Sequence, residues 1–319
     1  MKRTVAVLYG GRSGEHEISL RSAESVIAAL RTERYDVLKF FIDKDGRWSP
    51  NAIQPEPGRN PGIDVVFPVL HGTFGEDGTV QGLLDLADLP YVGAGVLGSS
   101  ACMDKEVTKR LLHEAGIPVV EFYVAAESRA NPFGYPVFVK PANLGSSVGI
   151  SKARSAEELQ RAIETAQQYD SRVLVERAIV GQELECAVLG NEAPQAATPC
   201  EILPSREFYD YDDKYLLDKA QVRLPAGLPD AELQKIRQIA VKAFLAVHCA
   251  GMARVDFLRE QTTGRLYVNE INTIPGFTSI SMYPKMWEHA GVSMAELVDR
   301  LIELAMERHA RRKALRYSR

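Results

Sequence analysis

The first hundred residues alternate short apolar runs with a helical pattern, and this alternation limits the fold more than any other feature. Apolar runs cover residues 4–9, 37–42 and 65–70, and residues 19–30 carry apolar side chains at helical spacing. Strands that alternate with helices form a parallel sheet with helices on its faces. Ligands of such sheets bind beyond the carboxyl ends of the strands, so residues 10–17 and 71–78 lie at a candidate site.

The rest of the chain has a different texture and divides into two further parts. After a helix over 104–115, short strands are predicted at 119–124, 137–140, 149–152, 172–176 and 183–189. Further on we predict a helix at 230–247, strands at 252–258 and 265–271 joined by a turn, and a last helix from Ser293. Ser155 with Glu158, and Ser293 with Glu296, have the spacing of a capping box. We therefore predict an α/β domain at 1–103, a small α+β domain at 104–183 and a third domain at 184–319.

Length and composition agree with a soluble multidomain protein. The 319 residues are 45% hydrophobic and 25% charged, which excludes disordered and low-complexity classes. We find neither a signal peptide nor an apolar run long enough to span a membrane, so we expect a cytoplasmic protein. The four cysteines are widely spaced and are expected to be reduced and buried. A basic tail from Arg308 to Arg319 could bind nucleic acid. We prefer a structural explanation, because the tail continues an amphipathic helix and the carboxyl end of a helix favours cations.

A glycine turn follows the first strand at residues 10–14. It does not fit the G-x-G-x-x-G dinucleotide fingerprint, and Glu15 stands where a pyrophosphate would bind. A carboxylate at this position can cap the helix, or it can hold a cationic group such as an ammonium.

A second glycine loop, FVKPANLGSSVGI at residues 138–150, joins two predicted strands. Free backbone N–H groups, hydroxyls and the ammonium of Lys140 suit a polyphosphate. The loop is not a Walker A motif, because its lysine precedes the glycines. An ordinary hairpin turn is the alternative interpretation.

The strongest candidate site lies in the last two predicted strands. Arg254 and Asp256 share one face of their strand, and Glu270 and Asn272 share one face of the next. Pairing of the strands would gather two carboxylates and an amide, which are hard oxygen ligands suited to Mg²⁺ held jointly with substrate phosphates. A surface pair with Arg254 as partner is the less favoured alternative, because the intervening residues are apolar. The loop that follows, at 273–282, can offer backbone donors to an oxyanion or a carboxylate.

Four motifs together resemble the D-alanine:D-alanine ligase family of the ATP-grasp superfamily. They are GGRSGEHEIS at residues 10–19, LHGTFGEDG at 70–78, YDYDDKY at 209–215 and NEINTIPG at 269–276. The resemblance covers residues 4 to about 300. It implies a Rossmann-like N-terminal domain followed by a two-part ATP-grasp α+β unit. It also implies an enzyme that uses ATP to join two D-alanines for peptidoglycan synthesis.

The resemblance also assigns roles at the amino-acid subsites. Glu15 should hold the ammonium of the first D-alanine, with His71 lining the same subsite. Ser146 and Tyr215 should form a hydrogen-bonded set with Glu15, and Ser281 and Met282 should hold the carboxylate of the second substrate. By the same resemblance, Tyr215 favours an amine acceptor over a hydroxy acid. The segment 205–219 that contains it is predicted to be a lid that shields an acyl phosphate from water.

The remaining roles concern ATP, the metal ions and the oxyanion. The resemblance implies that Lys105 and Lys140 neutralise ATP phosphates, that Lys214 reaches the transferred phosphoryl group, and that Glu176 and Glu183 contact adenine and ribose. Asp256, Glu270 and Asn272 match the ligands of two Mg²⁺ or Mn²⁺ ions. Arg254 and the backbone N–H of Gly276 should stabilise the tetrahedral oxyanion.

Several alternatives stay open at this stage. Another dipeptide ligase, such as a D-alanine:D-lactate ligase, uses the same chemistry, and a nucleotide sensor or a nucleic-acid binder would be a different class of protein. We expect no nucleic acid and no membrane as partners. A homodimer is usual for the family, and a monovalent cation activates some members, but the residues establish neither.

Overall fold

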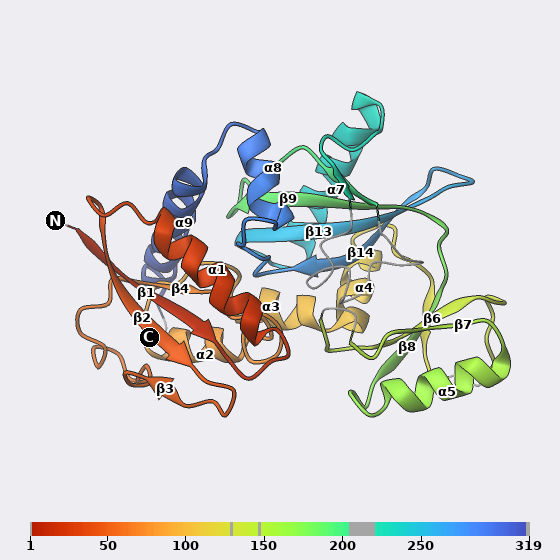
Figure 1. Ribbon diagram of the computed structural model, residues 1–319, viewed down its shortest axis with the longest axis horizontal. Coiled ribbons are helices and arrows are strands. Elements are labelled where there is room, and N and C mark those ends of the chain that lie inside the picture. Colours follow the sequence, from red (N-terminus) through yellow and green to blue (C-terminus); the bar gives the residue numbers. More distant parts are fainter. Residues whose placement is uncertain (1, 128–129, 146–147, 204–220, 317–319) are drawn as a thin grey trace.

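A computed structural model describes residues 2–127, 130–145, 148–203 and 221–316 (Figure 1). The described residues form three sheets, which follow one another along the chain. The strand orders are β3-β2-β1-β4, β5-β8-β6-β7 and β12-β11-β9-β13-β14, with β10 paired to β9.

The N-terminal sheet is parallel at its centre, as predicted. Strands β1 (Arg3–Gly10), β2 (Tyr35–Ile42) and β4 (Val65–Pro68) run parallel, and β3 (Trp48–Ser49) pairs antiparallel to β2 at the edge. Val5 and Val7 face a core shared with α1 (His16–Ala29), whereas Ala6 and Leu8 face α2 (Thr79–Leu86). Both faces of β1 are therefore buried, which explains its continuous apolar run.

The middle sheet is antiparallel and carries one helix. It contains β5 (Phe122–Val124), β6 (Val137–Pro141), β7 (Ser151–Ala153) and β8 (Val173–Arg177). Helix α5 (Ala156–Ala166) covers one face, and its N-cap Ser155 accepts a hydrogen bond from the Glu158 N–H at 3.2 Å, as the capping box predicts. The opposite face, with Lys140 and Glu176, turns towards the rest of the molecule.

The C-terminal sheet contains the longest strands. They are β9 (Gly181–Gly190), β10 (Gln195–Ala196), β11 (Cys200–Leu203), β12 (Gln221–Arg223), β13 (Gly251–Glu260) and β14 (Leu266–Asn272). One face packs on α7 (Asp230–Ala246) and on α4 (Lys105–Glu114), and the other packs on α8 (Met282–His289) and α9 (Met294–Lys313). All four cysteines are free and buried, as predicted.

Element boundaries differ from prediction where the local backbone is unusual. The strand expected from residue 149 begins at Ser151, because Gly149 has a φ of +72°, which breaks an extended strand. The strand expected from residue 119 begins at Phe122, and Val119 instead forms a bridge with Val268 of the C-terminal sheet. Sequence analysis missed α2, α3 (Val96–Met103), α8 and the short strands β3, β10, β11 and β12.

Helix α9 joins the N-terminal and C-terminal sheets. Its residues Leu297, Val298, Leu301 and Ile302 are buried in one core with Val5 and Val7 of β1 and with Met252 of β13. Its basic end contacts the last turn of α2 and the segment that follows it: Arg312 pairs with Asp85, Lys313 lies 2.9 Å from Asp88, and Arg308 stacks on Tyr91. The basic tail therefore binds the N-terminal part of the same chain over the described residues. In the ranges described, no helix is both long enough and apolar enough to cross a membrane.

The contact between α9 and the segment that follows α1 provides a test of this junction. Asp299 is 5% exposed, and it lies 3.1 Å from Arg31 and 2.5 Å from Arg34. Asp299→Ala should lower the free energy of unfolding by about 1–3 kcal/mol, because two cations lose a buried carboxylate. Urea unfolding measures this loss. Glu303→Ala is the matched control: Glu303 pairs with the same Arg34 but is half exposed, so its loss should stay below about 0.5 kcal/mol. Equal losses in the two variants would contradict the assigned role of Asp299.

Candidate active site

The predicted cluster of polar residues forms on one face of β13 and β14. Arg254 is paired with Asn272 across the strands, and Asp256 is paired with Glu270. The Arg254 guanidinium donates from Nε and Nη2 to the two oxygens of Asp256, both at 2.7 Å, and Asn272 Nδ2 donates to Asp256 at 3.0 Å. The residues between them, Val255 and Ile271 among them, are buried in the opposite face, so the predicted alternation is confirmed.

Glu185 is a further member of this cluster that sequence analysis missed. It lies on β9 directly opposite Asp256, is 5% exposed, and has Oε2 at 3.2 Å from Arg254 Nε. Burial alone would lower the pKa of Arg254, but the carboxylates of Asp256 and Glu185 outweigh it and raise that pKa well above its usual range. Arg254 is therefore a permanent cation held between two carboxylates.

Glu15 lies where three segments meet. Its Oε2 is 2.6 Å from the position that a Cβ at Gly72 would occupy, and 3.2 Å from the corresponding position at Gly145. Gly72 also has a φ of +71°, so a larger residue would be strained there as well as blocked. Glu15 is the N-cap residue of α1, but its side chain makes no capping hydrogen bond, so the predicted role as a helix cap is not realised. Contact with a cationic group stays a prediction.

His71 is buried and held by both ring nitrogens. Nδ1 lies 2.9 Å from the carbonyl oxygen of Ile274, and Nε2 lies 3.1 Å from the hydroxyl of Ser22. A carbonyl only accepts, so Nδ1 carries the proton and Nε2 accepts from Ser22. Burial lowers the pKa of His71, which agrees with a neutral ring. Ser22, on α1, was not singled out in the sequence.

Glu76 ties the loop after β4 to the loop after β14. Its carboxylate oxygens accept hydrogen bonds from the N–H of Gly72 at 2.7 Å and from the N–H of Ile274 at 2.8 Å. Burial, with the nearby charge of Glu15, raises the pKa of Glu76 to about 8. Glu76 belongs to the LHGTFGEDG motif, but only the structure reveals that it joins two distant loops.

The loop after β14 is fixed by contacts within itself. The Thr278 N–H donates to Ser281 Oγ at 3.0 Å, and the Ser281 N–H donates to the Thr278 carbonyl at 3.0 Å. Gly276 fits closely, because a Cβ there would lie 2.6 Å from Ser281 Oγ. Met282 begins α8. The structure thus brings Gly276 and Ser281 together.

One cavity of about 40 Å³ unites residues from distant parts of the chain. It is lined by Glu76, Cys102, Met103, Lys105, Leu144, Gly145, Glu270, Ile271, Asn272 and Thr273. Three predicted site residues, Lys105, Glu270 and Asn272, therefore share its wall. The other described site residues do not line it: Glu15, His71, Lys140, Glu176, Glu183, Arg254, Asp256, Gly276, Ser281 and Met282. Ser146, Lys214, Tyr215 and the 205–219 segment lie outside the described residues.

Lys140 and Glu176, both predicted to contact ATP, are in direct contact with each other. Lys140 Nζ lies 2.7 Å from Glu176 Oε2 and 3.2 Å from Asn269 Oδ1. The second oxygen of Glu176 faces Lys109 at 3.1 Å. Burial alone would raise the pKa of Glu176, but the two lysines outweigh it and lower that pKa to about 2. Lys105 Nζ donates to the carbonyl of Leu144 in the glycine loop.

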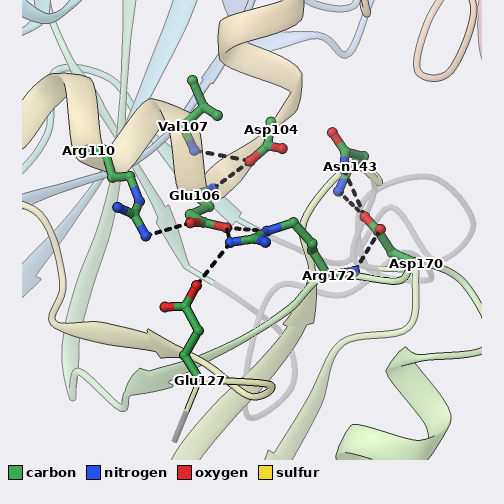
Figure 2. A network of polar contacts seen from close by, with 8 residues as sticks. All are labelled: Asp104, Glu106, Val107, Arg110, Glu127, Asn143, Asp170 and Arg172. Atoms are coloured by element: carbon green, nitrogen blue, oxygen red, sulfur yellow. Dashed lines mark hydrogen bonds and ion pairs between the residues drawn. The ribbon is translucent and has the colours of Figure 1, made fainter.

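A network of polar contacts connects the first turn of α4 with the start of this loop (Figure 2). Figure 2 shows Arg172 reaching Glu106 of α4, while Asp170 accepts from the backbone and side chain of Asn143 at 2.8 and 2.9 Å. Asp104 caps α4 by accepting from the N–H groups of Glu106 and Val107. These contacts position Lys105 at the first turn of α4 beside the glycine loop.

Comparison with known proteins gives full-length matches. The family described as D-ala D-ala ligase C-terminus matches residues 111–303, and its N-terminus counterpart matches 4–61 and 52–94. A D-alanine--D-alanine ligase from Solibacter usitatus is 61% identical over 327 residues and covers 100% of both chains. One from Thermoanaerobacter sp. is 48% identical, over 97% of this chain and 98% of the relative.

Solved structures of the same kind share the fold. The D-alanine-D-alanine ligase from Coxiella burnetii has a TM-score of 0.86 and 40% identity, over 98% of this chain and 96% of that one. The VanG D-Ala:D-Ser ligase from Enterococcus faecalis has a TM-score of 0.87 and 36% identity, over 96% of this chain and 100% of that one.

The buried neutral ring of His71 predicts a dependence of stability on pH. An unfolded histidine takes up a proton near pH 6.5, whereas folded His71 resists protonation because its pKa is lowered. The free energy of unfolding should therefore fall as pH drops below about 6.5, by at most about 1.4 kcal/mol per pH unit from this group. Urea unfolding between pH 5 and 8 should give a shallower slope for His71→Gln than for the wild type. His289→Gln, at an exposed position on α8, should keep the wild-type slope, and an unchanged slope in His71→Gln would contradict the assignment.

Proposed function

The chain belongs to the D-alanine–D-alanine ligase family, and we infer that it is an ATP-dependent ligase that joins two D-alanines for peptidoglycan synthesis. ATP phosphorylates the carboxylate of the first D-alanine and leaves as ADP. The amine of the second attacks the carbonyl carbon of the acyl phosphate, and loss of phosphate and a proton gives the dipeptide. The observation that carries this inference is the single cavity that gathers Lys105 and Gly145 with Glu270 and Asn272.

The substrate end of the site is assigned to Glu15 and His71. Glu15 lies against the two glycines Gly72 and Gly145, and a side chain at Gly72 would collide with its carboxylate. His71, held by Ile274 and Ser22, forms a neutral wall of the same subsite. We assign the carboxylate of the second substrate to Ser281 and Met282. Ser146 and Tyr215 are assigned to orienting the first substrate with Glu15.

The phosphate end is assigned to cations of the middle part of the chain. Lys105 and Lys140 lie at the first turn of α4 and on β6, and both suit ATP phosphates because an ammonium is a point charge for phosphate oxygens. Lys214 is assigned to the phosphoryl group, Glu176 to adenine and Glu183 to ribose. Arg254 and the N–H of Gly276 are assigned to the oxyanion, where loss of one donor typically costs about 100-fold to 1000-fold in rate.

The residues on β13 and β14 fit Mg²⁺ or Mn²⁺. Asp256, Glu270 and Asn272 offer hard oxygen atoms on one face of the strand pair. Within the described ranges, no three His, Cys, Asp or Glu residues gather closely enough to hold a metal ion by themselves. We therefore infer that phosphate oxygens of ATP complete the ligand sets of two ions. When bound, the ions screen the charge of the transferred phosphoryl group.

The same inference extends to organisation and setting. We propose domains at residues 1–103, 104–183 and 184–319, with a lid at 205–219 in the third domain. We also propose that the protein is a cytoplasmic homodimer and that a monovalent cation activates it, as in some members of the family.

The second candidate function is a ligase with another acceptor. It is favoured by one observation, a TM-score to a D-Ala:D-Ser ligase that is as high as the TM-score to a D-alanine ligase, because the fold itself does not distinguish acceptors.

Substrate use tests the proposed function. The purified protein should release phosphate from ATP only with Mg²⁺ and D-alanine, and mass spectrometry should identify D-alanyl-D-alanine. L-Alanine should give no release, because the family to which the chain belongs joins the D-enantiomer. Adding D-serine or D-lactate to D-alanine tests the second candidate. If D-alanyl-D-serine or D-alanyl-D-lactate formed in excess of D-alanyl-D-alanine, the assignment of D-alanine as the acceptor would be wrong.

Glu270→Gln tests the metal assignment. The substitution keeps the shape of the side chain but removes one carboxylate from the ligands, so turnover should fall by at least about 1000-fold while the protein stays folded. Circular dichroism checks the fold. Glu260→Gln is the matched control on β13, because its carboxylate pairs with Arg177 at 2.8 Å and does not line the cavity, so turnover should stay within about twofold. Near-normal turnover in Glu270→Gln would exclude the metal site.

A further inference from the structure

Lys109 is a buried cation that none of the roles above uses. It lies on α4 one turn after Lys105 and is 1% exposed. Its Nζ lies 3.1 Å from Glu176 Oε1 and 5.8 Å from the centre of the Phe122 ring. Lysine is among the residues least often buried, because removing its charge from water is costly. A fully buried lysine beside predicted ATP contacts therefore needs a physical reason.

Glu176 is shared by two lysines. One carboxylate oxygen faces Lys109 and the other faces Lys140, and Glu176 itself is only 2% exposed. The three side chains carry two positive charges and one negative charge, so one positive charge is left over. Burial lowers the pKa of Lys109, and the charge of Glu176 opposes that effect. The surplus positive charge has no partner within the trio.

Removing Lys109 would change the state of Lys140. Glu176 and Lys140 would then form a one-to-one buried ion pair, and at low dielectric such a pair attracts strongly. The ammonium of Lys140 would be neutralised by Glu176 and less able to bind an anion. With Lys109 present, the negative charge of Glu176 is also offset by the ammonium of Lys109 on the side away from Lys140.

We propose that Lys109 is a positioning residue for ATP: it neutralises Glu176 and so leaves the positive charge of Lys140 available to the phosphate groups of the nucleotide. The inference rests on the proposed function, because it takes Lys140 as an ATP ligand. It adds a role for a residue that does not itself touch ATP. A merely structural lysine would support α4 without any preference for phosphates.

Nucleotide binding separates the two roles. Adenosine, ADP and ATP with Mg²⁺ are titrated by calorimetry into the wild type and into Lys109→Met. The substitution should weaken ATP and ADP binding at least about tenfold, as expected for loss of a charge-assisted contact, and should leave adenosine within about twofold. Equal weakening of all three ligands would show a structural role, and unchanged ATP binding would overturn the proposal.

Arg110→Met is the matched control. Arg110 follows Lys109 on α4, and it pairs with Glu106 on the exposed side of the helix at 2.7 Å. The control removes a cation from the same helix but not from the trio, so ATP binding should stay within about twofold. A tenfold loss in this control would mean that any cation on α4 acts at long range, which would also overturn the proposal.

A double variant provides the decisive rescue. In Lys109→Met/Glu176→Gln no carboxylate remains to neutralise Lys140, so the ratio of ATP to adenosine affinity should return towards that of the wild type. Both substituted side chains are uncharged, so the double variant leaves no unpaired buried charge at these two positions. It therefore keeps the proposal testable if Lys109→Met alone does not fold. Failure of the rescue would overturn the role of Lys109.

The outcome is separable from that of the proposed function. If the wild type releases phosphate with D-alanine but Lys109→Met binds ATP normally, only the role of Lys109 is wrong. If the wild type binds ATP, Lys109→Met loses it selectively and D-alanine gives no phosphate release, the role of Lys109 stands and the substrate assignment is wrong.

Discussion

Arg254 keeps its positive charge although its side chain is only 18% exposed, and much of the site follows from that constraint. A guanidinium does not give up its proton at any ordinary pH, so an arginine that is largely shielded from water must be surrounded by acceptors. Here Asp256 binds it through two hydrogen bonds, and Glu185 approaches from the neighbouring strand. Three strands, β9, β13 and β14, thus present charged groups on one face while their other face packs on α7 and α4. The cluster is stable because the strands place its opposite charges in contact, and it is polar enough to bind ligands because those charges do not fully cancel.

Sequence reasoning succeeded where the deciding contacts are local. Asp256, Glu270 and Asn272 sit on adjacent strands joined by a short turn, so the alternation of side chains fixes which of them share a face. Glu185 was missed because its position depends on the pairing of β9 with β13, which joins strands distant in the sequence. Glu76 and Ser22 were missed for the same reason, since each contacts the loop after β14 from the N-terminal part of the chain. The parallel sheet was predicted because both faces of β1 are buried, whereas short strands such as β10 and β12 leave too little pattern to detect.

The family resemblance assigned roles to residues that the hydrophobic pattern and motif chemistry alone do not assign, and the structure adds further contacts for those residues. The resemblance assigned Glu176 to an adenine contact, and the structure shows that its carboxylate also forms ion pairs with two lysines. The importance of Lys109 could be inferred only from its burial in the structure, because lysines four residues apart on a helix are typical of a face exposed to solvent. Similarly, the sequence predicted that the basic tail continues a helix, but it did not predict that Arg312 and Lys313 bind Asp85 and Asp88 of the same chain.

The two ends of the site carry opposite surpluses of charge. On the lysine side, Lys109 and Lys140 exceed Glu176 by one positive charge, and Lys105 adds another at the cavity wall. On the strand side, Asp256, Glu185 and Glu270 exceed Arg254, so that end is negative. Buried charge of one sign is costly unless it is compensated. The proposed ligands match this division, because the phosphates of ATP would offset the lysines and Mg²⁺ would offset the carboxylates. A nucleotide without phosphates would leave the lysines uncompensated, and ATP without Mg²⁺ would leave the carboxylates uncompensated. Under the proposed function, the arrangement of charges would therefore favour the metal–nucleotide complex over either ligand alone.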